Sequence, residues 1–475
     1  MSSARCRLNL IGGHLHQSNE QRKVSEFPLL PAAEREKYIN SVFYRDSVSS
    51  STPRLLSLNS LNSNQGPVFR DQNVITATRK VSMVPGPVEI SEAVRQSMSL
   101  SPLVHTSPEF VEIFHQVLKK LRILIGNNKE TNGGQALVLS GSGTLGWDIL
   151  GSNLINSSTS NILCISTGFF SDSMVQCLSN YVDNESTQVD ILRPDTIGAQ
   201  VPLNSIKKAL ASKKYDWITL TQTDTSTGVL TDVKAISELV HQVSPSTMIA
   251  IDGVCSVGVE EIQFDNWKLD YVLTASQKAL SSPAGLLVSF LSQRAIDLNS
   301  KYKKKKPFYS SLDKWLPIMV NYENRKPSYF ATPLSQLIMA LNTSLTEILG
   351  DITEIDTVSG LPKALVERFV KHESHAKLLR EKLVTKETGL KNVVVAPEDA
   401  CSGMTALYVP EGTNVPSLLS HISSVYKINL AGGIHPQIST RYIRIGHMGI
   451  SVTENDGADL KAVIEAIVAS LKAIA

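Results

Sequence analysis

Seven short apolar runs, separated by other segments, constrain the fold of this chain more than any other feature. One separating segment, DVKAISELVHQV (232–243), has apolar residues at helical spacing. Strands that alternate with helices in this way form a mostly parallel sheet covered on both faces. The sequence therefore predicts an α/β fold around a mostly parallel seven-stranded sheet. The runs are ALVL (136–139), ILCI (162–165), VDIL (189–192), WITL (217–220), MIAID (248–252), YVLT (271–274) and LLVSF (286–290).

The chain of 475 residues exceeds the size of one ordinary core, so more than one domain is expected. Residues 1–75 include SVSSSTPRLLSLNSLNSN, which is rich in Ser and Asn, and are expected to be a disordered N-terminal extension. Residues 76–335 are predicted to form a large domain with an N-terminal arm. Its first long helix is expected to begin at the capping pair Ser107 and Pro108.

Residues 336–475 are predicted to form a smaller C-terminal α+β domain. PKALVERFVKHESHAKLLREKLV predicts a long helix, strands are expected near VVVA, TALYV and YIRI, and a last helix is expected from about Glu454.

Composition excludes several classes of protein. The 46 basic and 44 acidic residues give a formal net charge of +2, which argues against a nucleic-acid partner and favours small molecules. The five cysteines contain no CxxC pair, so neither a disulfide framework nor a metal site is predicted. No apolar run reaches the roughly 18 to 20 residues that span a bilayer, so membrane insertion is not expected.

A glycine-rich turn, SGSGTLG (140–146), follows the first apolar run. It matches GxGxxG, which is typical of dinucleotide-binding enzymes when an acidic residue ends the next strand. Ser166, Thr167 and Gly168 stand there instead, so the nicotinamide interpretation weakens. Backbone N–H groups of such a turn at a helix N-terminus suit a phosphate, although a tight turn without a ligand is the alternative.

Three further strand ends carry reactive groups, and ligands of parallel sheets bind at the carboxyl ends of strands. Asp252 closes MIAID, where a carboxylate needs a partner; a helix cap or structural ion pair is the alternative. Lys278, after YVLT, loses solvation and becomes a candidate amine nucleophile, with a surface lysine as the alternative. TDTSTGVL (223–230), after WITL, offers hydroxyl groups that could contact a ligand; the alternative is that these residues only form a turn. A phosphate cradle, a lone carboxylate and a desolvated lysine together complement pyridoxal 5′-phosphate.

Six segments also resemble a known family. SGSGTLGWD, TDTSTGVL, IDGVCSVGVEE, LTASQKALSSPAGL, SYFATP and AGGIHPQISTRYIRIGHMG resemble the class V, fold-type I aminotransferases, and most closely the alanine:glyoxylate aminotransferases of fungal type. The resemblance covers about Val81 to the C-terminus. It implies a pyridoxal-phosphate enzyme that converts L-alanine and glyoxylate to pyruvate and glycine, serving glycine synthesis.

Alternatives remain open. Serine could replace alanine as the donor, as in serine:pyruvate or serine:glyoxylate aminotransferases. A lyase or desulfurase is disfavoured by Gln277, where desulfurases have histidine, and by Arg444. A non-catalytic cofactor binder is disfavoured by the intact set of Lys278, Asp252 and Arg444.

The resemblance assigns cofactor roles by position. It implies that Lys278 is the Schiff-base lysine and that Asp252 is the partner of the ring nitrogen. Phe170 matches the aromatic residue that stacks on the ring, a position held by Trp in mammalian relatives, and Thr225 matches the hydroxyl beside the phenolic oxygen. Thr144 departs from the histidine of some relatives. The implied phosphate binders are Ser142, Gly143, Thr144 and Gln277.

The remaining implied residues concern the partner subunit and the substrate. Tyr329 and Thr332 match residues that reach the phosphate of a neighbouring subunit, which implies a homodimer with shared active sites. Arg444 matches the arginine that grips the substrate α-carboxylate, whose planar shape suits a guanidinium fork. Gly86, within Pro85-Gly86-Pro87, matches the loop that lines the substrate pocket.

The N-terminal segment RLNLIGGHL (7–15) fits the second type of peroxisomal targeting sequence: a basic residue and leucine, five spacers, then histidine and leucine. Its two pairs lie nearly two helical turns apart, so a helix would present them on one face to an import receptor. The peroxisome is the expected compartment. A mitochondrial presequence is an alternative, because residues 1–19 contain arginines and no acidic residue, and the cytoplasm is another.

Overall fold

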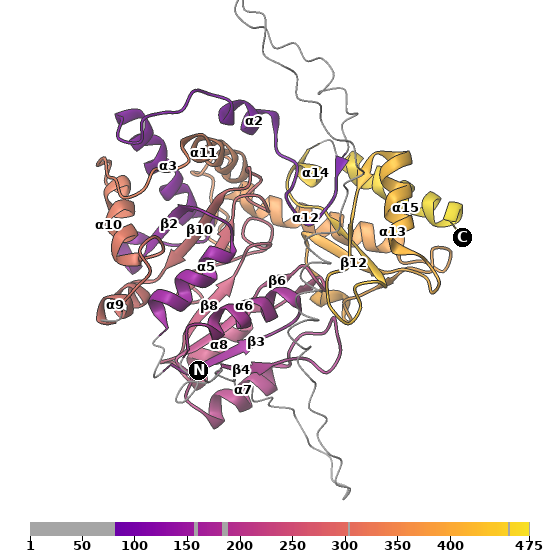
Figure 1. Cartoon of the computed structure of the whole chain (residues 1–475), viewed down its shortest axis with the longest axis horizontal. Coiled ribbons are helices and arrows are strands. Elements are labelled where there is room, and N and C mark those ends of the chain that lie inside the picture. The colour runs from indigo at the N-terminus through magenta and orange to yellow at the C-terminus, as the bar shows by residue number, and fades with distance from the viewer. Residues whose placement is uncertain (1–80, 156–159, 183–188, 303–304, 455–456, 475) are drawn as a thin grey trace, which may run out of the picture. The chain divides into compact units, whose positions relative to one another are not determined.

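A mixed sheet of seven strands forms the centre of the first part of the structure (Figure 1). The computed structural model describes residues 81–155, 160–182, 189–302, 305–454 and 457–474. β10 runs antiparallel to β2 and β9, and the other neighbouring pairs are parallel. All seven predicted strands are confirmed, with boundaries that differ by at most one residue. In spatial order they are β2 (Gln135–Ser140), β10 (Leu286–Leu291), β9 (Tyr271–Ala275), β8 (Met248–Asp252), β5 (Trp217–Thr221), β3 (Ile162–Ile165) and β4 (Val189–Leu192).

Helices connect these strands and cover the sheet. The predicted start of α3 is confirmed, because the Ser107 hydroxyl accepts a hydrogen bond from the Phe110 N–H at 3.3 Å and Pro108 is the first helical residue. Asp232 caps α8 in the same way through the Ala235 N–H at 2.9 Å. The helices are α2 (Glu92–Met98), α3 (Pro108–Leu124), α4 (Lys129–Asn132), α5 (Thr144–Ile149), α6 (Phe169–Ser179), α7 (Leu203–Ser212), α8 (Val233–Val243), α9 (Gln293–Lys301), α10 (Leu312–Glu323) and α11 (Ser335–Leu349), and a π-helical turn (Leu150–Leu154) extends α5.

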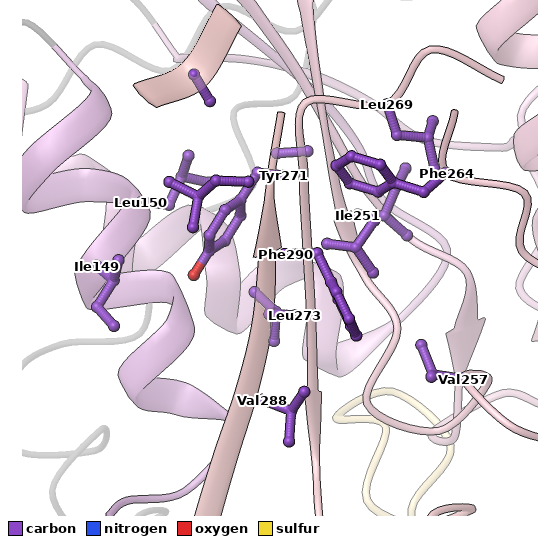
Figure 2. Close-up of a cluster of buried hydrophobic side chains, with 14 of the residues drawn as sticks. Ile149, Leu150, Ile251, Val257, Phe264, Leu269, Tyr271, Leu273, Val288 and Phe290 are labelled. Carbon is purple, nitrogen blue, oxygen red and sulfur yellow. The ribbon is translucent and has the colours of Figure 1, made fainter. Parts of the chain in front are cut away.

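The inner strands β3, β5, β8, β9 and β10 are buried at every position, as expected for a sheet covered on both faces. Figure 2 shows Tyr271 beside Leu150 on one side of the strands and Phe264 beside Leu269 on the other. The Tyr271 hydroxyl donates to the Gly146 carbonyl at 2.9 Å, so the start of α5 is fixed against the sheet.

A second, antiparallel sheet lies in the C-terminal part, drawn in orange and yellow in Figure 1. The strand predicted near VVVA is wrong in detail: β11 ends at Asn392, and the Val395 N–H donates to the Gly198 carbonyl at 2.9 Å instead of continuing the sheet. The last helix starts at Ala458. The elements are β11 (Lys391–Asn392), β12 (Met404–Tyr408), β15 (Tyr442–Gly446) and β14 (Ala431–Gly432), with α12 (Lys363–Leu383), α13 (Val415–His421), α14 (Ile450–Thr453) and α15 (Ala458–Ile474), a 3₁₀ turn (Pro397–Asp399) and a π-helical turn (Ile422–Tyr426).

The two sheets have separate apolar cores. Leu341 and Leu345 of α11 belong to the first core, and Leu379 and Leu383 of α12 belong to the second. Two strand pairs complete the structure: β1 (Val81–Ser82) with β13 (Ile428–Asn429), and β6 (Thr223–Asp224) with β7 (Val229–Leu230).

The expected domain limits stay predictions, and the expected extension (1–75) with its targeting segment lies outside the described residues. Across the described ranges, every helix is too short or too polar to traverse a bilayer.

Candidate active site

The predicted cofactor residues lie at one edge of the large sheet. Asp252 ends β8, Lys278 follows β9, Thr225 follows β5, Phe170 follows β3, and residues 142–144 follow β2. These five strands run in the same direction, because β10 is antiparallel to both of its neighbours. Their carboxyl ends therefore meet at the edge where parallel sheets bind ligands.

Asp252 is a buried carboxylate held by neutral donors. It is 3% exposed, its Oδ2 accepts the indole N–H of Trp147 at 2.9 Å, and its Oδ1 accepts the Val254 N–H at 3.0 Å. Burial raises the pKa of Asp252 to about 6, and the two hydrogen bonds limit the rise by stabilising the charged form. The carboxylate is therefore mostly ionised above neutral pH, as a partner for a protonated ring nitrogen must be.

The amine of Lys278 contacts the N-terminal arm. Its Nζ donates a hydrogen bond to the Pro85 carbonyl, and the Val88 N–H donates to the Gln277 carbonyl at 3.0 Å. Gly86 has φ +97°, and a Cβ placed there would overlap the Lys278 side chain, 2.6 Å from Nζ. Only glycine allows this close approach without strain. The structure thus brings together the lysine and the predicted substrate loop.

The glycine-rich turn places two hydroxyl groups next to each other before α5. The hydroxyls of Ser142 and Thr144 lie 2.6 Å apart, and both residues are exposed. A Cβ on Gly143 would lie 2.7 Å from the Val254 side chain, so the turn packs tightly on the loop that follows Asp252. The side-chain oxygen of Gln277 is buried and has no hydrogen-bond partner among the described residues.

A buried aspartate, Asp224, links the segments that carry Phe170 and Thr225. Its carboxylate accepts the Ser171 N–H and hydroxyl, both at 3.0 Å, and the Ser226 hydroxyl at 2.6 Å. These bonds join the first turn of α6, which carries Phe170, to the loop that carries Thr225. Phe170 is partly buried and Thr225 is buried.

Arg444, in β15 of the second sheet, contacts the loop that carries Thr225. It is 9% exposed; its Nε donates to the Gly432 carbonyl at 2.7 Å and its Nη1 to the Thr225 carbonyl at 3.3 Å. Among the described residues Nη2 has no hydrogen-bond partner, which leaves a donor for a carboxylate. Tyr442, two residues earlier on the same strand, donates to the Ser226 carbonyl, so β15 contacts the site loop at two points.

Tyr329 and Thr332 lie apart from this cluster in the single chain. Tyr329 is 59% exposed, its hydroxyl lies 3.5 Å from that of Thr332, and its ring centroid lies 4.8 Å from that of His105. Within the described ranges, no hydrogen bond joins either residue to the other predicted site residues.

Sequence reasoning missed three residues that organise the site. Trp147 and Asp224 were visible inside the quoted motifs, as an indole three residues into a helix and an acid among hydroxyls. Arg368 of α12 gave no signal, because it resembles any charged residue on an amphipathic helix. Its Nε donates to the Gly258 carbonyl at 2.7 Å and its Nη2 to the Ala279 carbonyl at 3.0 Å, which ties the segment after Asp252 to the segment after Lys278.

The fold is that of the pyridoxal-phosphate transferases, and it brings a lysine, a buried carboxylate and a glycine-rich turn to one edge of the sheet. The chain belongs to the class V aminotransferases. Residues 98–305 match the model of that family, described as aminotransferase class-V. The resemblance stated from the sequence is thereby confirmed.

Individual relatives narrow the comparison. The chain is 43% identical over 377 residues to alanine–glyoxylate aminotransferase 1 of Saccharomyces cerevisiae, covering 78% of this chain and 92% of that protein. It is 26% identical over 373 residues to a serine–glyoxylate aminotransferase of Hyphomicrobium methylovorum, covering 77% and 84%. The crystal structure of alanine–glyoxylate aminotransferase from Nostoc sp. superposes with a TM-score of 0.71 at 21% identity, covering 88% of this chain and all of that one, which confirms the fold.

The family implies pyridoxal 5′-phosphate, and the residues present fit that group. Gln277 directly precedes Lys278, and its carboxamide NH₂ group is a donor of the kind a phosphate needs. Asp252 keeps a carboxylate buried without an ion pair among the described residues. The turn at 142–144 offers hydroxyls and backbone N–H groups at a helix start.

Proposed function

We propose that this enzyme transfers the amino group of L-alanine to glyoxylate, giving pyruvate and glycine, with pyridoxal 5′-phosphate bound to Lys278. The relative that is 43% identical carries this activity in its name. The observation that supports the chemistry most is the convergence of Lys278, Asp252 and Arg444 on one sheet edge, with Arg444 bonded to the carbonyl of Thr225.

Each proposed cofactor residue would hold a different part of the cofactor. Asp252 would accept a hydrogen bond from the protonated ring nitrogen and keep the proton there, Phe170 would stack on the ring, and Thr225 would face its phenolic oxygen. When bound, the cofactor supplies an aldehyde that condenses with amines and a ring that accepts electrons. The phosphate binders in this proposal are Ser142, Gly143, Thr144 and Gln277.

The protein's own groups then bind substrate and move protons. The guanidinium of Arg444 binds the α-carboxylate and fixes the orientation of the Cα–H bond. The amine of Lys278 would act as the base that takes the proton from the substrate Cα, and then as the acid that returns it to the aldehyde-derived carbon of the cofactor. Gly86 lines the substrate pocket next to the Lys278 amine, and its lack of a side chain leaves room for that amine. With glyoxylate the same residues act in the reverse order and release glycine.

Steady-state rates with glyoxylate and a panel of amino donors test this assignment. We expect alanine to give the highest kcat/KM. A higher value with serine would favour the serine–glyoxylate alternative, whose named relatives are less similar to this chain. Absence of transamination with every donor would overturn the proposed function.

We also propose a homodimer in which Tyr329 and Thr332 complete the partner's phosphate site. Their exposure supports this proposal, as does the exposed aromatic residue Phe308, which is 75% exposed and packs on Phe330 at 5.4 Å between ring centroids. The Tyr309 hydroxyl, next to Phe308 in the sequence, donates to the Ser140 carbonyl at 3.0 Å.

Mixed dimers test the shared site. A Lys278→Ala subunit and a Tyr329→Ala subunit are each expected to be impaired alone. Mixing them after mild dissociation should restore activity, because one of the two sites in a mixed dimer then combines an intact lysine with an intact tyrosine. Unchanged low activity in a mixture shown to contain mixed dimers would contradict the proposal.

Peroxisomal import through residues 7–15 is the third proposal, and its support is the sequence motif alone. A fluorescent protein fused to residues 1–40 should enter peroxisomes, and replacement of Leu8 and Leu15 should abolish import. Mitochondrial or diffuse fluorescence from the unaltered fusion would contradict the proposal.

A further inference from the structure

Trp147 occupies a position in the site that the transamination mechanism does not use. It lies in α5, immediately after the proposed phosphate turn, and is 6% exposed. Its indole N–H donates to Asp252 Oδ2 at 2.9 Å, across 105 residues of sequence. Within the described part of the chain, Asp252 accepts one hydrogen bond from a side chain, that of Trp147, and one from the backbone, the Val254 N–H.

The groups facing Asp252 make this bond important for its charge. Asp224 lies beyond the end of β5, and its negative charge opposes ionisation of Asp252. Lys278, after β9, favours the ionised form. Two further titratable groups lie nearby, Cys255 on the loop after β8 and Tyr271 in β9. Lys278 is also the residue that condenses with the cofactor in the proposed function, so its positive charge is not constant.

We infer that Trp147 is a positioning residue for the cofactor: its N–H holds the Asp252 carboxylate ionised and fixed in orientation to receive the ring N–H. An indole suits this task because it is a donor only, carries no charge and cannot exchange its proton with the carboxylate at ordinary pH. A cationic partner would neutralise Asp252 and weaken its attraction for a protonated ring nitrogen. This inference rests on the proposed function.

The chain offers a matched control for Trp147. Trp217 in β5 is fully buried, and its indole nitrogen has no hydrogen-bond partner among the described residues. Trp147→Phe and Trp217→Phe therefore remove the same atoms from the interior, and only the first removes a donor from Asp252. The dissociation constant of pyridoxal 5′-phosphate is measured for both variants and the unaltered enzyme by equilibrium dialysis between pH 5 and 9.

Affinity is expected to fall at the acidic end as Asp252 takes up a proton. Trp147→Phe should move the midpoint of this fall upward by about one pH unit relative to both other proteins, the tenfold change expected from the loss of one hydrogen bond to a charged group. A role in packing alone predicts weakening by the same factor at every pH. An unmoved midpoint in Trp147→Phe would therefore overturn the inference.

A second measurement needs no variant of Trp147. The full chain is labelled with 5-fluorotryptophan at its four tryptophans, freed of cofactor and titrated by fluorine NMR. One resonance should shift with a midpoint near pH 6, and Asp252→Asn should abolish that shift. A titration that persists in Asp252→Asn, or no titrating resonance at all, would overturn the inference. The proposed function fails by a different result, the lack of transamination by the unaltered enzyme.

Discussion

Replacement of Asp252 by asparagine should stabilise the cofactor-free protein at pH 8 while it destroys activity. Burial raises the pKa of Asp252 from 3.8 to about 6, so the native state binds more protons than the unfolded state between these values. The free energy of unfolding therefore falls as pH rises through this range. At about 1.4 kcal/mol per pKa unit, ionisation of Asp252 costs about 1 to 2 kcal/mol at pH 5 and about 3 kcal/mol at pH 8.

Asparagine has a similar shape and does not ionise, so the variant avoids this loss. Its NH₂ group must face one of the two N–H donors, Trp147 or Val254, and this mismatch costs about 1 to 2 kcal/mol at every pH. The two effects nearly cancel at pH 5. At pH 8 we expect the variant to be more stable by about 1 to 2 kcal/mol.

Urea unfolding of both cofactor-free proteins at pH 5 and pH 8, at equal protein concentration, measures this difference. The stability gain should be larger at pH 8 by about 1 to 2 kcal/mol. Activity of the variant with alanine and glyoxylate should fall by about a hundredfold or more, because in the proposed function the ring nitrogen then loses its charged partner. Equal stability changes at the two pH values would show that burial does not raise the pKa of Asp252.

Two further substitutions probe the contacts around the reacting amine and the substrate. Gly86→Ala should lower kcat/KM by about 10- to 100-fold, because the new Cβ would overlap the Lys278 side chain. Gly412→Ala is the control, because Gly412 also has positive φ but has no atom within 4 Å of the added Cβ, and its steady-state rates should be unchanged. Similar rates for the two variants would contradict this prediction. Arg444→Lys should raise KM for alanine by about 10- to 100-fold, because lysine cannot form the two parallel hydrogen bonds that a guanidinium makes to a carboxylate. The control is Arg441→Lys at an exposed position. An unchanged KM in Arg444→Lys would exclude Arg444 from carboxylate binding.

The large sheet could be predicted from the sequence because its inner strands are buried on both faces. Strands such as WITL and MIAID are continuous apolar runs, and their ends bring Asp252 and Lys278 to one edge by topology alone. The small sheet was less readable. The β-branched run VVVA indicates a strand, yet the Gly198 carbonyl accepts the Val395 N–H and draws the chain away from the sheet.

Contacts within the site could not be predicted, because they depend on how distant segments approach one another. The bond from Lys278 to the Pro85 carbonyl spans 193 residues, and the bond from Trp147 to Asp252 spans 105. No local pattern specifies either one. The sequence indicated which residue types were present at each strand end, and the structure adds which neutral donor holds the carboxylate and which backbone segment covers the lysine.

In the proposed function, Lys278 carries the cofactor covalently. Borohydride reduction of the holoenzyme, followed by proteolysis and mass spectrometry of the peptides, tests it directly. We expect the reduced cofactor on the peptide that contains Lys278 and on no other lysine. A modified lysine elsewhere in the chain, or recovery of an unmodified Lys278 peptide from fully active enzyme, would overturn the assignment of Lys278.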